Sequence, residues 1–151
     1  MQMGTASGTL AEKVYIVVQE DGAELIQPGE VCEWVATTTS ARQGLMVQVI
    51  DTAINATTGI AAKVAGVAET TISTSSIGRL QVYGAGNVRA SASYNLGKSM
   101  VAGSINATNI GHVQESLETT VTSIQYLNCY VGVALENGPN ATNCTVMIDV
   151  L

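Results

Sequence analysis

The sequence predicts an all-β fold: a compact β-barrel or β-sandwich of short strands, preceded by a flexible N-terminal arm. Short runs rich in Val, Ile, Thr and Tyr alternate apolar and polar residues, as strands with one buried face do. Clusters of Gly, Asn, Asp, Ser and Pro separate these runs, and these residue types form turns. Hydrophobic residues make up 46% of the 151 residues, which is too apolar for a disordered chain.

The charge balance excludes several function classes. Six basic and twelve acidic side chains give a net charge of −6, which repels phosphate backbones and argues against nucleic acid as a partner. The chain has one His and no apolar run of about 20 residues. We therefore expect neither His-centred catalysis nor a membrane span. At this length the prediction is one domain over residues 12–151.

The N-terminal third contains three predicted strands. Residues 1–11 are small and polar without periodicity, which indicates a flexible arm. Strands are expected over 13–19, 31–35 and 45–50, separated by turn residues that include Pro28-Gly29.

The middle of the chain continues this pattern after a predicted loop over 51–58. An Ala- and Val-rich strand is expected within 59–68, and the clearest alternation of the chain lies over 78–84. The stretch Gly84-Ala85-Gly86-Asn87 is expected to form a turn before a short strand over 88–94. A further strand is expected within 97–105.

The C-terminal part contains one ambiguous segment, residues 113–124. Its apolar residues fit a helical stripe, but its several Thr and Ser residues are poor helix formers, so a strand is favoured. Strands over 126–135 and 145–151 then flank a Gly-Pro turn, and a hairpin centred near Gly138 would keep Cys129 and Cys144 apart. The total is about nine to eleven strands.

An internal β-loop-β repeat is visible over residues 64–84 and 130–151. Gly66-Val67-Ala68-Glu69 precedes a polar loop and an alternating strand, as does Gly132-Val133-Ala134-Leu135-Glu136. The spacing from Gly66 to Leu80 equals that from Gly132 to Val146, 14 residues in each copy. Two such copies suggest duplicated halves of one barrel or sandwich.

The repeat also carries a resemblance to a known family. The unit around residues 65–84 and the chain end over 132–151 resemble small capsid decoration (cement) proteins of tailed bacteriophages. The loop over 137–143 departs from that family, whose members often have an acidic, Ala- and Gly-rich loop there. The resemblance covers roughly the last two-thirds of the chain.

The resemblance implies a structural protein on the outer surface of the assembled phage head. Such a protein would bind the major capsid protein, self-associate as a homotrimer and stabilise contacts between capsid subunits. The absence of a basic and apolar leader at the start of the sequence leads us to expect synthesis in the host cytoplasm. Neutral polar surface is also cheaper to desolvate than charged surface, which suits a protein that assembles.

Candidate interface residues come from the arm, the large aromatic side chains and the three arginines, whose guanidinium groups can bond to a neighbour's carboxylates. They are Thr5, Leu10, Trp34, Arg42, Arg79, Tyr83, Arg89 and Tyr94.

No catalytic, metal or cofactor site is predicted. His112 has no second imidazole to share a metal and no G-x-S-x-G elbow to serve, so both roles are rejected. The three cysteines, Cys32, Cys129 and Cys144, lack a C-x-x-C spacing and are expected to be packed thiols.

Three alternatives stay open. The first is another virion module, such as a head fibre base, a tail component or a receptor-binding component. The second is a carbohydrate-binding β-sandwich, which would need Trp34 or tyrosines exposed as platforms. An enzyme is the third and most distant alternative.

Overall fold

The computed structural model describes residues 12–21, 24–35, 45–50, 63–102, 111–116, 129–139 and 143–150. The prediction of an all-β fold is confirmed, because the described elements form one nine-stranded sheet. The predicted arm over 1–11 and the loop over 51–58 lie outside the described residues.

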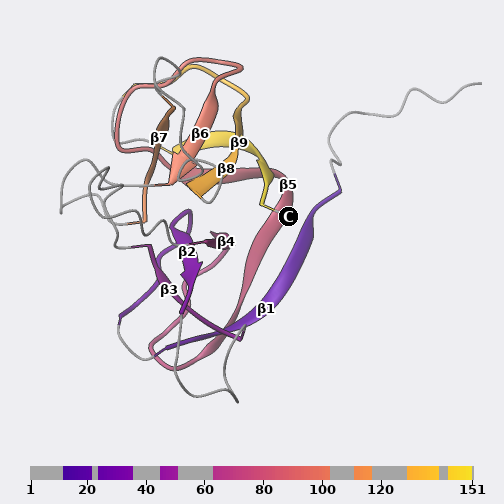
Figure 1. Ribbon diagram of the computed structural model, residues 1–151, viewed down its shortest axis with the longest axis vertical. Coiled ribbons are helices and arrows are strands. Elements are labelled where there is room, and N and C mark those ends of the chain that lie inside the picture. The colour runs from indigo at the N-terminus through magenta and orange to yellow at the C-terminus, as the bar shows by residue number, and fades with distance from the viewer. Residues whose placement is uncertain are drawn as a thin grey trace, which may run out of the picture.

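Most strands follow the predicted runs (Figure 1), but the separate strand expected over 88–94 does not form, because Val88 and Arg89 end β5 and the next strand begins at Ser99. Their bounds are β1 Val14–Glu20, β2 Val31–Trp34, β3 Met46–Val49, β4 Val64–Ala68, β5 Ile77–Arg89, β6 Ser99–Ala102, β7 Val113–Glu115, β8 Tyr130–Ala134 and β9 Asn143–Asp149. Of the ambiguous segment 113–124, the structure makes the first three residues a strand, and residues 117–124 lie outside the description.

Five strands close into a small barrel in the order β1-β3-β2-β4-β5, with β5 returning to β1. The β1–β3 pair is parallel and the other pairs are antiparallel. Closure gives each of the five strands a neighbour on both sides, which removes the exposed sheet edges.

The remaining strands continue the sheet from β5 in the order β9-β8-β6-β7. A parallel bridge between Ala90 and Val113 returns β7 to the end of β5. The C-terminal half of the chain therefore forms a second five-stranded ring, and this ring shares β5 with the first.

The two rings are structural repeats of each other. We call residues 14–83 the first module and residues 84–149 the second module. Both antiparallel hairpins pair in the same register, because Ala68 lies opposite Leu80 in the first module as Ala134 lies opposite Val146 in the second. The bulge between Cys32 and Glu33 in β2 recurs between Met100 and Val101 in β6.

The turns and ring closures correspond as well. The amide of Gly29 donates to Ala68 O at 2.8 Å, and the amide of Gly97 donates to Ala134 O at 2.8 Å. The parallel pair Glu20–Val47 in the first module matches the bridge Ala90–Val113 in the second. The repeat over 64–84 and 130–151 is thus one part of a larger correspondence that includes β2 with β6 and β3 with β7.

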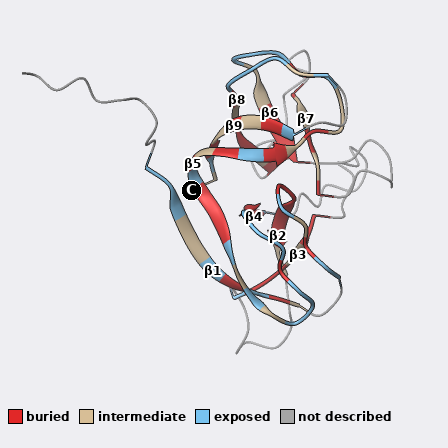
Figure 2. Ribbon diagram, turned by 180° about the vertical axis from the view of Figure 1, so that it is seen from behind, coloured by how far each residue is buried: buried red, intermediate tan, exposed pale blue. Residues whose placement is uncertain are grey.

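The long strand β5 joins the two modules and corrects the prediction of a turn at Gly84–Asn87. These residues continue the strand, pairing in register with residues 145–148 of β9. Gly84 has φ +96°, and a Cβ there would meet the backbone of Glu12. A left-handed glycine bends the strand without ending it, so β5 leaves the first ring and enters the second (Figures 1 and 2).

Two hydrophobic clusters fill the structure. One lies inside the first module and includes Val18, Cys32, Val47 and Leu80. The other fills the second module with the corresponding residues Val88, Met100, Val113 and Val146. The second cluster also contains residues from the outside of the first module: Val31, Ile50, Val64 and Val67. The two modules therefore pack against each other through apolar side chains.

The β8–β9 hairpin has a different register from the predicted one. Gly132 lies opposite Ile148, so the hairpin is centred near position 140 rather than Gly138. This register places Cys129 and Cys144 further apart along the strands than the predicted one does.

Replacing Gly132 with Ala should destabilise the protein by about 1–3 kcal/mol, because the added Cβ would overlap the Met147 carbonyl. Gly66 lies at the corresponding position and would meet Gln81 O at 2.9 Å, so Gly66→Ala should behave alike. Urea unfolding followed by circular dichroism measures both effects.

The control for these substitutions is Gly97→Asn. Gly97 has φ +79°, and no atom lies within 4 Å of the place that a Cβ would take. Asn also tolerates the left-handed region. A loss of stability for Gly97→Asn as large as for Gly132→Ala would contradict the close-approach explanation.

Candidate interaction surfaces

The junction between the modules is held by backbone hydrogen bonds. Arg89 N donates to Gly29 O at 2.9 Å, and Val31 N donates to Gly111 O at 2.8 Å. Gly111 N in turn donates to Ile50 O at 3.0 Å. The β2 end of the first module is therefore bonded to β5 and the residues before β7 in the second module.

An ion pair reinforces this junction. Arg89 Nη1 lies 2.9 Å from Glu30 Oε1, and the Glu30 side chain is 11% exposed. The second carboxylate oxygen of Glu30 accepts from Gln27 N at 2.7 Å within the turn. A half-buried arginine thus satisfies a buried carboxylate across the two modules.

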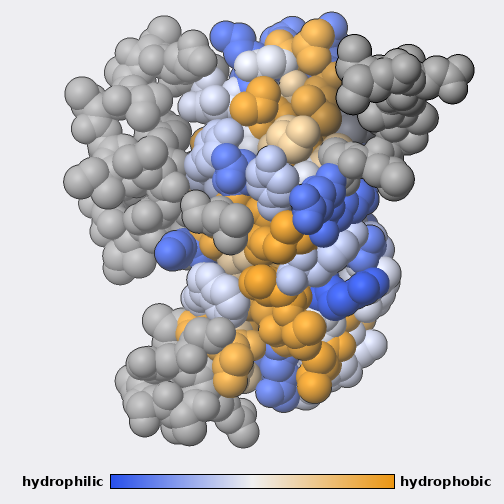
Figure 3. Space-filling view, turned by 90° about the vertical axis from the view of Figure 1, so that its right-hand side faces the viewer, coloured by the Kyte–Doolittle hydropathy of each residue, from blue (hydrophilic) through white to orange (hydrophobic). Residues whose placement is uncertain are grey.

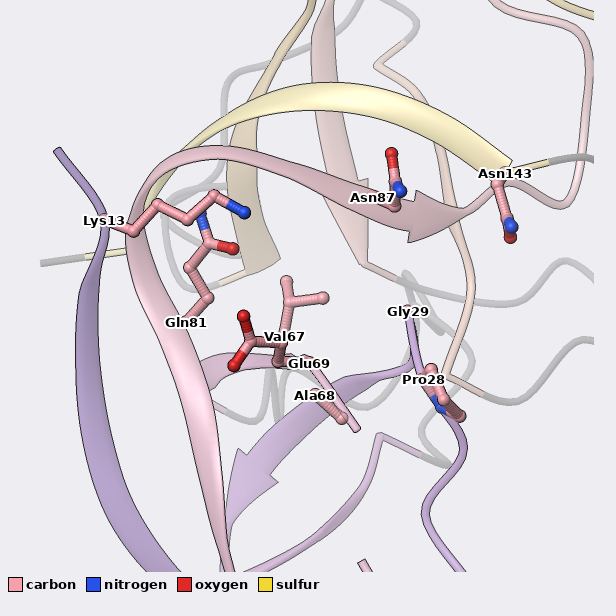
Figure 4. A pocket seen from close by; sticks show the side chains of 9 residues that line it. All are labelled: Lys13, Pro28, Gly29, Val67, Ala68, Glu69, Gln81, Asn87 and Asn143. Carbon is pink, nitrogen blue, oxygen red and sulfur yellow. The ribbon is translucent and has the colours of Figure 1, made fainter. Parts of the chain in front are cut away.

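A small polar pocket of about 170 Å³ opens beside the junction. Its lining comes from both modules, and in Figure 4 Lys13, Glu69 and Gln81 gather at one end while Asn87 and Asn143 lie on the β5 and β9 strands.

Two polar side chains of this pocket, Glu69 and Gln81, are hydrogen-bonded within the fold. Gln81 Nε2 donates to the carbonyls of Tyr83, Gly84 and Ala85 at 2.9–3.2 Å. Glu69 accepts from Tyr15 at 2.6 Å and from Arg79 at 3.1 Å. These bonds fix the bend in β5 and the outer face of β1. The pocket therefore lies at the module junction, with Lys13, Asn87 and Asn143 completing its polar lining.

His112 lies beside the same junction. Burial lowers its pKa, with the positive charge of Arg89 adding to the effect and Glu30 opposing it. Its Nδ1 is buried without a hydrogen-bond partner, and no group of three His, Cys, Asp or Glu able to hold a metal occurs among the described residues. The described part of the chain also has no helix long and apolar enough to span a membrane.

The three cysteines are free and buried. Burial raises the pKa of each thiol, in Cys144 to about 11. Nearby carboxylates raise the pKa of Cys32 and Cys129 further. The predicted packed thiols are confirmed in this structure.

The predicted interface residues divide into three groups. Arg79 and Tyr83 are exposed, and Arg79 is paired with Glu69 and stacked 5.2 Å from the Tyr15 ring centroid. Arg89 bonds within the chain instead of reaching a neighbour. Tyr94 is only 3% exposed, with its hydroxyl donating to Asn143 O, and Trp34 packs against the first core. Thr5, Leu10 and Arg42 lie outside the described residues.

Tyr94 is buried and Trp34 is half-buried, and their predicted interface role stays a prediction. Both sit on strand or bridge positions whose side chains face a module interior, and side-chain direction in a β-structure follows from pairing rather than from residue type. Among the described aromatic residues only Tyr83 is exposed, while Tyr15, Trp34 and Tyr130 are half-buried.

Large exposed hydrophobic residues gather on two surfaces that the sequence did not predict. The first, here the β1 face, comprises Val17, Gln19, Leu45 and Ile77; the Gln19–Ile77 pair and the Gln19 N to Leu45 O bond bring these residues together. The second, here the β8 face, comprises Leu96, Lys98, Ser99, Val133 and Leu135. Figure 3 shows hydrophobic side chains along the side of the molecule that carries β1 and β5.

The sequence carried one signal for these surfaces. A strand that alternates should place polar residues outward, so Val17 and Ile77 on outward positions are departures from the pattern. The departure becomes visible only when the pairing of β1 with β5 is known.

Comparisons with known proteins bear on the fold. No protein-family model matches the chain, and no curated protein matches its sequence. Among solved structures, the chain is similar to the crystal structure of the head fiber gp8.5 N base in bacteriophage phi29, with a TM-score of 0.58 and 11% sequence identity. The similarity covers 91% of this chain and 95% of that chain. At this identity the likeness establishes a shared fold.

Replacing Arg89 with Met should cost about 1–3 kcal/mol of unfolding free energy, because the buried Glu30 carboxylate loses its charged partner. The matched control is Arg79→Met, whose pair with Glu69 is exposed and should contribute at most about 1 kcal/mol. Urea titrations of both variants give the comparison. Equal losses would show that the Arg89–Glu30 pair does not hold the junction.

The thiols should react slowly in the folded protein. Since a raised pKa leaves little thiolate at about pH 8, an aromatic disulfide reagent should label almost no cysteine before unfolding and all three after guanidinium is added. Absorbance of the released thiolate measures the reaction. Rapid labelling of one thiol in the native protein would contradict the burial described above.

Proposed function

We propose that this protein is a structural component of a bacteriophage virion that binds the outer surface of the assembled head. The supporting observation is the structural likeness to a head fiber base across nearly the whole length of both chains. The low charge and neutral polar surface agree with a protein that buries its outside in an assembly.

The proposed work is mechanical and not enzymatic. Packaged DNA pushes outward on a phage head, and a protein that binds only the assembled lattice stabilises that lattice by mass action. Such binding requires a large contact area and copies arranged with the symmetry of the lattice. Glu69 and Gln81, two of the polar side chains of the pocket, are hydrogen-bonded within the fold, which is in keeping with a mechanical role.

In the finer form of the proposal, the chain is a decoration protein. It forms a homotrimer, contacts the major capsid protein and bridges neighbouring capsid subunits. The sequence resemblance to decoration proteins favours this form, and three copies on a local threefold axis would each reach a different capsid subunit.

A second candidate is the base of a head fibre, which the structural likeness favours specifically. A fibre base occupies selected positions of the head and carries further protein outward. A decoration protein instead occupies the lattice throughout. The two candidates therefore differ in the number of copies bound per head.

Mixing the purified protein with undecorated heads of its phage should give co-sedimentation that saturates at a fixed ratio. A ratio near one copy per capsid subunit supports decoration, and a much lower saturating ratio supports a fibre base. Densitometry of the pelleted proteins and electron microscopy of the heads measure the ratio and the position.

The control is heads that already carry their full surface proteins, which should bind no more. A protein that stays in the supernatant at every concentration contradicts both candidates. Glycan arrays would then test the carbohydrate-binding alternative.

A further inference from the structure

The internal repeat reveals which surfaces the modules use for contact. The first module contributes the turn and strand around Pro28, Glu30, Val31 and Val67 to the junction. In the second module, Arg89 and Gly111 bond to the first module, and Asn87 and Asn143 line the pocket beside this contact. Each module has a counterpart of the surface that the other module uses.

The counterpart surfaces are the β1 face and the β8 face. By strand register, Val17, Gln19, Leu45 and Ile77 of the first module correspond to Asn87, Arg89, Gly111 and Asn143 of the second. Likewise, Leu96, Lys98, Ser99, Val133 and Leu135 correspond to Pro28, Glu30, Val31, Val67 and Glu69. The pair of modules therefore has two free ends: the first module presents the β1 face at one end, and the second module presents the β8 face at the other.

Both counterpart surfaces carry exposed apolar side chains, together with polar Gln19 on the β1 face and half-buried Lys98 and Ser99 on the β8 face. Val17, Leu45 and Ile77 are 66%, 58% and 73% exposed, and Leu96 and Leu135 are 60% and 41% exposed. These five account for most of the large exposed hydrophobic side chains of the described residues; the others are Val14, Leu25 and Tyr83. Exposed apolar residues grouped on a face mark an interaction site.

The backbone hydrogen bonds at the β1 face differ from those at the corresponding positions of the junction. At the junction, Arg89 N and Gly111 O bond to the β2 end of the first module, whereas the corresponding Gln19 N and Leu45 O bond to each other at 2.9 Å. The β1 face therefore offers no open backbone groups at this point. Its contact must be made by side chains, and Val17, Leu45 and Ile77 replace the polar Asn87 and Asn143 and the Gly111 of the junction.

We infer that the β1 face of one copy of this chain binds the β8 face of a second copy, head to tail. The occupant is a second copy because the chain itself carries both halves of the contact, at the positions where its own modules meet.

A head-to-tail contact uses two different surfaces, so it leaves one of each unsatisfied until a ring closes. A closed ring of three would give the homotrimer of the proposed function, and it would bury the exposed apolar residues of every copy. The inference deepens the proposed function and rests on it for the number of copies, but its test is made in solution without heads. Self-association can therefore stand or fall separately from head binding.

The test compares two single substitutions, Ile77→Lys on the β1 face and Leu96→Glu on the β8 face. Each should raise the apparent dissociation constant of the oligomer about tenfold or more, because a charge is placed in an apolar contact. The double variant Ile77→Lys/Leu96→Glu should regain much of the lost association, since the Lys of one copy then meets the Glu of the next. Sedimentation velocity over a concentration series measures all four proteins.

The matched control is Leu25→Lys, an exposed leucine on neither face, which should associate as the wild type does. Circular dichroism and thermal melts confirm that each variant folds, and Val17→Lys with Leu135→Glu repeats the test at independent positions. A wild-type protein that stays monomeric overturns the inference. Association insensitive to both single substitutions, or weakened by only one of them, also overturns it, because a head-to-tail contact needs both faces.

Discussion

The structure depends on one strand that belongs to two rings. The first half of β5 pairs with β1 on one side and β4 on the other, and its second half pairs with β9 and approaches β7 through Ala90. Backbone groups that leave water must find partners, so a strand shared in this way fixes the positions of both rings at once. The bend at Gly84 lets the strand turn from one ring into the next without losing its ladder to β9.

The junction follows from this arrangement. Once β5 has left the first ring, Arg89 is carried against the Gly29–Val31 segment, where its amide and guanidinium both find partners. Apolar residues on the outside of the first module then join the second core. The polar pocket is what remains where these surfaces do not meet, and its side chains brace the bend in β5.

A duplicated module also explains the uneven surface. On the β1 face, apolar Val17, Leu45 and Ile77 occupy the positions that Asn87, Gly111 and Asn143 hold beside the junction. This distribution is opposite to that of a protein that stays alone in water, in which the free ends would be polar. It agrees with the self-association inferred above, in which neighbouring copies cover both ends of the chain.

The sequence by itself determined the strand class, most strand positions and the two hairpins of the repeat, because alternation, β-branched residues and turn residues are local signals. It also determined the low charge that favours assembly. The tertiary structure decided the rest: the continuity of β5 through Gly84–Asn87, the closure of two rings, the burial of Tyr94 and the exposure of Ile77. These features depend on which strands pair across long separations, and pairing sets the direction in which every side chain points.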